Sequence, residues 1–175
     1  MVKAELITPI KNYKGDLICG NINNFDDLTL LNKYKFDYIF HQAAISDTRV
    51  YDQTIVMETN INSFYNLLNL AKKDNAAMIY ASSAAIYGNL PSPQTEGHES
   101  PENPYGFSKL MMDHIANQYS RENPGMEIIG LRYFNVYGER QPTKGQYAPV
   151  IGLFLKQKQN GKPMTIVGDG LQTRD

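Results

Sequence analysis

The segment AAMIYASSA, residues 76–84, decides how the rest of the chain is interpreted. It is a short, nearly continuous apolar run that ends in small residues, which is typical of a buried strand in a parallel sheet. A helical pattern lies on each side of it, at residues 54–73 and 103–120, and a further strand pattern lies beyond each helix, at residues 36–44 and 127–138. This alternation predicts an α/β fold.

Periodicity and turn residues predict the remaining elements. In the helix at residues 54–73, helical spacing assigns the buried face to Ile55, Phe64, Leu67, Leu68 and Ala71. The weaker patterns are a strand at 16–20, a helix at 25–34 that Asp26 or Asp27 would open, a Pro-rich loop at 90–104, a helix at 148–161 that Gly161 would end, and a strand with a turn at 164–170.

Composition narrows the function classes. The 175 residues carry 17 Lys and Arg against 18 Asp and Glu, so no nucleic-acid partner is indicated and a small molecule is expected. A single cysteine, Cys19, excludes an internal disulfide, and no Cys/His spacing suggests a metal site. No apolar run reaches the roughly 20 residues of a membrane span, and the start does not resemble a signal peptide. We expect a cytoplasmic protein without membrane contact.

Three predicted strands end in small or polar residues, at 43–46, at 82–84 and at Asn135. In open parallel sheets ligands bind beyond the carboxyl ends of the strands, where small residues let a ligand approach the backbone. The sequence therefore predicts a ligand cleft at this edge of the sheet.

Tyr105 and Lys109 stand four residues apart at the start of the helix at 103–120, and hence on one helical face. A phenol acts as a base near neutrality only when its anion is stabilised, and a neighbouring ammonium and the helix N-terminus both do that. Ser83, at the end of the preceding strand, could hold the reacting hydroxyl. From spacing alone, an acid–base pair and a solvated Tyr and Lys on a surface helix both stay open.

Five motifs resolve that ambiguity by resemblance: HQAAISDT (41–48), YASSAAIYG (80–88), PYGFSK (104–109), LRYFNVYG (131–138) and VGDGLQTRD (167–175). In this order and approximate spacing, the chain from about residue 16 to its end resembles the extended short-chain dehydrogenase/reductases that act on nucleotide sugars. The resemblance implies a Rossmann-like, doubly wound parallel sheet that binds NAD or NADP.

The resemblance also implies roles for the pair. Tyr105 would be the acid–base residue, Lys109 would hold the nicotinamide ribose and favour the tyrosine anion, and Ser83 would bind the substrate oxygen. The implied reaction is transient oxidation of a sugar carbon to a ketone, followed by reduction from the other face, which is an epimerisation.

Further binding residues follow from the same resemblance. For the cofactor it implies Gln42, Ala43, Ala44, Ile45, Ser46 and Asn60 beside the tyrosine and lysine, with Asn21 and Ile22 near the adenine. For the substrate it implies Asn135 and Arg174 besides Ser83. Asn60 could instead be a buried hydrogen-bonding residue, and Arg132 is interpreted as structural.

The subgroup stays open. Some segments resemble epimerases acting at C6 of ADP-heptose, for which Lys144 would be a second base, although it could equally be a solvated loop lysine. Others resemble epimerases acting at C4 of a UDP-hexose. A dehydratase or reductase of the same fold is the alternative, but dehydratases usually carry an acidic pair where Ala84 and Ala85 follow Ser83.

Family members begin with a strand and a Gly-rich turn, and no such turn precedes residue 16. We therefore expect an incomplete or decayed copy, in which the strand at 16–20 is the family's third and a gap follows it in the sheet. Residues 1–145 would form a partial NAD(P)-binding domain, and 146–175 the start of a substrate-binding domain. A non-catalytic remnant that binds a partner stays an alternative.

Family members usually form homo-oligomers through the helices that correspond to residues 54–73 and 104–123. Met111, Met112 and Ile115 are compatible with such an interface. A Met-rich helix face is also what an ordinary hydrophobic core requires.

Overall fold

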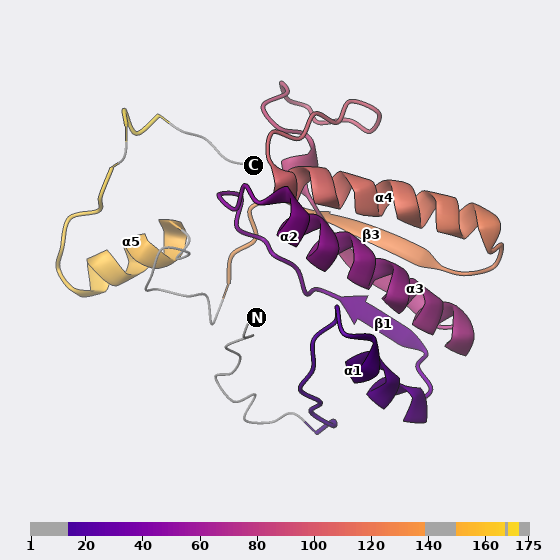
Figure 1. The fold of residues 1–175 in the computed structure, drawn as a ribbon. Coiled ribbons are helices and arrows are strands. Elements are labelled where there is room, and N and C mark those ends of the chain that lie inside the picture. The colour runs from indigo at the N-terminus through magenta and orange to yellow at the C-terminus, as the bar shows by residue number, and fades with distance from the viewer. Residues whose placement is uncertain (1–13, 139–149, 167, 172–175) are drawn as a thin grey trace.

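The computed structural model describes residues 14–138, 150–166 and 168–171. Short helices and strands alternate along it (Figure 1). In chain order they are α1 (Phe25–Thr29), the 3₁₀ turn η1 (Leu30–Lys33), β1 (Tyr38–His41), α2 (Gln53–Met57), the π-helical turn η2 (Glu58–Asn62), α3 (Ser63–Asp74), β2 (Ala77–Ser83), the 3₁₀ turn η3 (Ala84–Ile86), α4 (Pro104–Glu122), β3 (Ile128–Tyr133) and α5 (Val150–Gln159).

The three strands form a parallel sheet in the order β1-β2-β3, with β2 in the centre. In the register His41 lies opposite Tyr80, and Ser83 opposite Tyr133, so all three carboxyl ends lie at one edge. Both crossovers run in the same direction across the sheet, and their helices cover the same face, with the α2–η2–α3 rod beside α4 (Figure 1). The α/β prediction is confirmed.

The hydrophobic core lies between the sheet and these helices. It contains Phe64, Leu67, Leu68 and Ala71 as predicted, and also Met112 and Ile115, whose side chains are therefore core residues of the chain. Ile55 was wrongly assigned to the buried face, because it is 47% exposed. Ile55 lies in α2, and the π-helical turn η2 separates it from α3, so regular α-helical spacing does not extend the buried face of α3 back to Ile55.

The opposite face of the sheet is uncovered in the described part of the chain. On this face lie exposed apolar side chains of both outer strands: Tyr38, Phe40, Ile129, Leu131 and Tyr133. Only Ile79 of β2, which pairs with Phe40 and Ile129, is buried at the centre. The predicted burial thus holds for β2, whereas His41 is the one buried residue of β1 and β3 has none.

Two predicted strands are wrong. Residues 16–20 and 164–166 are not in strand conformation, and among the described residues no further strand pairs with them. The predicted gap would lie between residues 16–20 and β1, so the direct pairing of β1, β2 and β3 does not test it. The helix after residue 24 is opened by Asn24, whose side chain accepts from the Asp26 N–H, and not by Asp26 or Asp27.

The helix predicted to begin near residue 103 and the helix predicted to end at Gly161 are both confirmed. α4 begins at Pro104 behind the cap residue Asn103, and α5 ends shortly before Gly161, which has a positive φ of 63°. None of the helices in the described ranges has both the length and the apolar character that a membrane span needs.

Candidate active site

Lys109 lies in the interface between α4 and the sheet, although it carries a charge. Only 2% of the residue is exposed, and its ammonium donates a 2.7 Å hydrogen bond to the Ala81 carbonyl of β2. Burial lowers the pKa of Lys109 to about 8, and the charge of Asp113 partly opposes this. Within the described residues no carboxylate lies at ion-pair distance from this ammonium.

Tyr105 lies one helical turn before Lys109 and is half-buried. The Lys109 Nζ is 5.9 Å from the centre of the Tyr105 ring, so the predicted pair is assembled. The helix start that carries Tyr105 is fixed by Asn103, whose side chain accepts a 2.9 Å hydrogen bond from the Gly106 N–H. An ammonium therefore lies near the Tyr105 ring, and Tyr105 belongs to the first turn of α4, both of which the acid–base hypothesis requires.

Ser83 ends β2 at the same edge of the sheet and is buried. Its Oγ accepts a 3.1 Å hydrogen bond from the Ala85 N–H in the turn η3. A Cβ at Gly106 would lie only 2.6 Å from the Ala85 carbonyl oxygen, so the lack of a side chain lets α4 press against this turn. The close contact of Gly106 with Ala85 therefore places Tyr105 near the turn η3 that follows Ser83.

Asn60 is fully buried in the π-helical turn and joins two parts of the site. Its Oδ1 accepts from the Ile45 N–H at 2.9 Å, and its Nδ2 donates to the Ile45 carbonyl at 3.1 Å and to Ser108 Oγ at 2.9 Å. Ser108 in turn donates to the Tyr105 carbonyl at 2.7 Å. The alternative interpretation of Asn60 as a buried hydrogen-bonding residue therefore describes its contacts, and those contacts tie the segment after β1 to α4.

The predicted cofactor segment runs from the end of β1 along this edge of the sheet. Gln42, Ala43 and Ser46 are exposed, and Ala44 and Ile45 are half-buried. Ala43, Ala44 and Ser46 have small side chains, and Asn60 holds the backbone at Ile45, so an extended dinucleotide can lie against the chain here. These residues fit the NAD or NADP that the sequence predicts.

Asn21 and Ile22 lie in the turn before α1. The Asn21 N–H donates to Asp27 Oδ2 at 2.8 Å, and its side chain accepts from the Asn23 N–H at 3.0 Å. Asn23 Nδ2 donates to Thr59 Oγ1 at 3.2 Å, which brings this turn beside the residue that precedes Asn60. The two residues predicted to lie near the adenine, Asn21 and Ile22, are therefore next to the Asn60 part of the candidate site.

The predicted substrate residues are only partly described. Asn135 is exposed and follows β3 at the same edge as Ser83. Lys144 and Arg174 lie outside the described residues.

Sequence analysis missed three polar residues in this interface. Ser108 and Asp113 belong to the α4 stripe that contains Lys109, and spacings of three and four from Tyr105 and Lys109 could have signalled them. His41 ends β1, is 4% exposed and stacks on Phe64 at 5.7 Å. Burial, together with the charge of Lys109, lowers the pKa of His41 to about 4, so the ring is neutral at pH 7.

Comparison with known proteins identifies the family of the chain. Residues 3–175 match the model of the NAD dependent epimerase/dehydratase family. A curated relative from Brachyspira hyodysenteriae, ADP-L-glycero-D-manno-heptose-6-epimerase, is 38% identical over 147 residues, which are 82% of this chain and 46% of the relative. The chain thus spans about half the length of that relative.

Two solved structures are similar in sequence and fold. The Helicobacter pylori ADP-L-glycero-D-manno-heptose-6-epimerase is 47% identical, with a TM-score of 0.76 over 85% of this chain and 48% of its own. The Bacillus cereus UDP-glucuronic acid 4-epimerase, solved with UDP-glucuronic acid and NAD, is 34% identical, with a TM-score of 0.71 over 89% of this chain and 49% of its own. Because the family model covers nearly all 175 residues and the relatives share this α/β fold, the chain belongs to the NAD dependent epimerase/dehydratase family.

Proposed function

We propose that this chain carries the catalytic core of an NAD-dependent nucleotide-sugar epimerase. The observation that carries the proposal is the buried ammonium of Lys109 beside Tyr105. A buried cation without a carboxylate in contact destabilises a fold, and titratable groups with strongly shifted pKa values concentrate at functional sites. A solvated surface pair would have neither property.

Each residue of the site has a role in this reaction. Tyr105 takes a proton from a sugar hydroxyl and returns it, and the Lys109 charge stabilises the tyrosine anion between these steps. The Ser83 hydroxyl accepts from the Ala85 N–H, so its own proton can be donated to the sugar oxygen. NAD, which Gln42–Ser46, Asn60 and Lys109 would hold, supplies reversible hydride acceptance when it is bound.

The substrate is proposed to be an ADP-heptose that is epimerised at C6. The heptose-epimerase relatives, at 38% and 47% identity, support this choice over C4 of a UDP-hexose. In this proposal Lys144 is the second base, Asn135 and Arg174 contact the nucleotide sugar, and residues 146–175 begin the substrate-binding domain after an NAD-binding part at 1–145. A nucleotide-sugar reaction and a single exposed cysteine favour a cytoplasmic location.

Assembly is proposed to use the α2–η2–α3 rod and α4. Although Met112 and Ile115 are core residues, these helices still carry exposed apolar side chains, namely Ile55, Tyr65 and Phe107. A homo-oligomer would cover them.

The test uses the protein as purified from its own cells, so that any subunit containing these residues is assayed whole. Tyr105→Phe should keep NAD binding, measured by calorimetry, and should lose epimerisation of ADP-heptose, followed by NMR, by on the order of 10²–10⁴-fold. Tyr38→Phe is the matched control, because that phenol is exposed on the uncovered face of the sheet. Undetectable NAD binding by the unmodified protein, or equal turnover in both variants, would support the non-catalytic remnant instead.

A further inference from the structure

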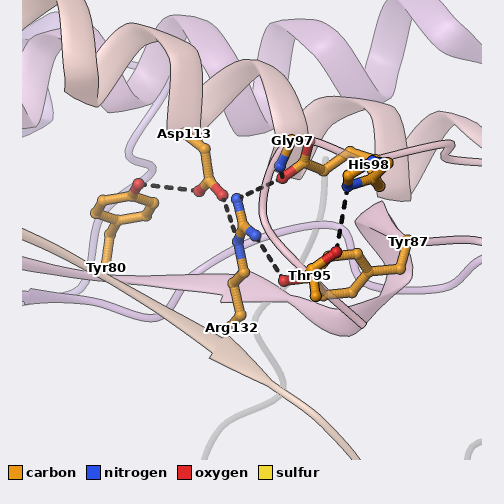
Figure 2. A network of polar contacts seen from close by, with 8 residues as sticks. Tyr80, Tyr87, Thr95, Gly97, His98, Asp113 and Arg132 are labelled. Carbon is orange, nitrogen blue, oxygen red and sulfur yellow. Dashed lines mark hydrogen bonds and ion pairs between the residues drawn. The ribbon is translucent and has the colours of Figure 1, made fainter. Parts of the chain in front are cut away.

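Arg132 on β3 connects three separate segments of the chain (Figure 2). Its Nε donates to Asp113 Oδ2 of α4 at 3.1 Å, and its Nη1 donates to the Tyr87 hydroxyl at 2.6 Å. Its Nη2 forms an ion pair with Glu99 Oε1 at 3.1 Å. Each guanidinium nitrogen therefore has its own partner, and the side chain is only 22% exposed.

Only the planar fork of arginine matches these three partners. The guanidinium carbon also lies 5.2 Å from the centre of the Tyr87 ring, at cation–π distance. The same Glu99 Oε1 also accepts a 3.2 Å hydrogen bond from the Gly97 N–H. A lysine could reach one of the three acceptors at a time.

Asp113 is fixed by two strands. Besides Arg132, it accepts a 2.9 Å hydrogen bond from the buried Tyr80 hydroxyl of β2. Tyr80 reaches it across β3 at Gly130, its register partner, where a Cβ would lie 2.5 Å from the phenol oxygen. The helix position of Asp113 is therefore determined by groups on β2 and β3 together.

This cluster is linked to the candidate active site in two ways. Asp113 lies one helical turn after Lys109, on the buried face of α4, and its charge opposes the effect of burial on the pKa of Lys109. Tyr87 and Glu99 lie near the two ends of the connection between η3 and α4, and that connection leads into Tyr105.

We propose that Arg132 is a positioning residue for the Tyr105–Lys109 pair, which it reaches through Asp113 on α4 and through Tyr87 and Glu99 on the connection at residues 87–103. This inference rests on the proposed function, because only that function makes the pair catalytic. The contacts that carry it were unused by the proposed reaction, which assigns no role to Arg132, Asp113 or Glu99.

The experiment follows two readouts in the complete protein. The ionisation midpoint of Lys109 is measured by ¹³C NMR of its Cε, with its titratable neighbours His41 and Asp113 in place. Backbone amide hydrogen exchange is measured over residues 88–103. Arg121→Met is the matched control, since Arg121 lies exposed on α4 and donates to the Asn117 carbonyl.

The variants should distinguish the link through Asp113 from the link through Tyr87 and Glu99. Arg132→Met should raise the Lys109 midpoint by roughly 0.5–1 pH unit, because the full charge of Asp113 then acts on the ammonium. It should also speed exchange over residues 88–103 by about tenfold or more. Asp113→Asn should lower the Lys109 midpoint and leave exchange over residues 88–103 unchanged. Glu99→Ala should leave the midpoint unchanged and speed exchange.

Equal midpoints in Arg132→Met and Arg121→Met would overturn the proposal, as would unchanged exchange. If Arg132→Met does not fold, the other two variants test the proposal. An unchanged midpoint in Asp113→Asn or unchanged exchange in Glu99→Ala would then overturn it. Neither readout needs NAD or sugar, so a failure of the proposed function is recognised separately by absent NAD binding. In the active protein, Arg132→Lys should lower kcat with KM little changed, whereas a purely structural Arg132 should leave kcat per folded molecule unaltered.

Discussion

Lys109 and Arg132 are two cations on the same side of one small sheet, and their surroundings differ in a way that separates function from structure. Lys109 is almost completely buried and meets one neutral carbonyl, and burial lowers its pKa to about 8. Arg132 is partly exposed and meets two carboxylates and a phenol. Desolvation lowers its pKa, but the Tyr87 hydroxyl and the Asp113 carboxylate outweigh this and raise the pKa above the ordinary value.

The difference follows from what each position needs. A cation that stabilises a fold is paired, because unpaired burial costs several kcal/mol. A cation that must face a cofactor and a tyrosine anion cannot already be neutralised by a carboxylate. Substitutions at the two positions should therefore have opposite consequences for activity and for stability.

The largest expected effect is on turnover at Lys109. Lys109→Met removes the charge that stabilises the Tyr105 anion, and should reduce epimerisation by on the order of 10²–10⁴-fold while the protein stays folded. Steady-state kinetics and circular dichroism measured together test this. Lys73→Met is the control, since that ammonium lies near the surface and donates to Asn32. Comparable turnover in the two variants would show that Lys109 is not catalytic.

Arg132→Met should have the largest effect on stability. It leaves Asp113 buried between α4 and β3 without its cation, which should lower the free energy of unfolding by about 3–5 kcal/mol. Urea denaturation measures the loss. The control Arg121→Met should change stability by less than about 0.5 kcal/mol. A loss of the same size in both variants would make Arg132 an ordinary surface cation.

These two residues also show what the sequence can predict. Tyr105 and Lys109 are local partners on one helix, and the short contacts of the core at Phe64, Leu67 and Leu68 follow from helical spacing in the same way. Arg132 contacts Asp113, Glu99 and Tyr87 across separations of 19, 33 and 45 residues. No periodic pattern encodes such distant contacts, and without them Arg132 could only be called structural.

The wrong strand at residues 16–20 has a related cause. A β-strand is defined by its hydrogen-bonded neighbour, and apolar residues such as Leu17 and Ile18 express only a preference. In the described residues no strand lies beside this segment, and Leu17 stays 68% exposed. By contrast, residues 76–84 were correctly assigned because strands on both sides satisfy the same apolar run.

His41 extends the comparison to a group without charge at pH 7. Burial and the Lys109 charge lower its pKa to about 4, whereas the unfolded chain protonates it near 6.5. The unfolded state therefore binds more protons between these values, and stability should fall as the pH falls from about 6.5 to 4, by roughly 2 kcal/mol at pH 5. His41→Phe should remove this part of the acid sensitivity, whereas the exposed His114→Gln should retain it. Parallel stability curves for both variants would place the acid sensitivity elsewhere.

The smallest expected effect is a gain in stability, for Lys109→Met. It tests the contrast between Lys109 and Arg132 most directly. The folded-state pKa of Lys109, about 8, lies below the ordinary 10.5, so the folded chain binds this proton less tightly than the unfolded chain. The resulting penalty is fully present below pH 8 and disappears as the pH rises to about 10.5. Lys109→Met should remove the penalty and lose the hydrogen bond to Ala81, which leaves a net stabilisation of about 1–2 kcal/mol at pH 7.

Urea denaturation of Lys109→Met at pH 7 and pH 10 measures that gain, which should shrink at the higher pH. A substitution that stabilises the fold while it abolishes turnover identifies a charge that the structure keeps for its reaction. If Lys109→Met instead loses stability as Arg132→Met does, the ammonium is a structural cation like the guanidinium. The separation between the two positions, and with it the argument that burial of Lys109 marks a catalytic site, would then fail.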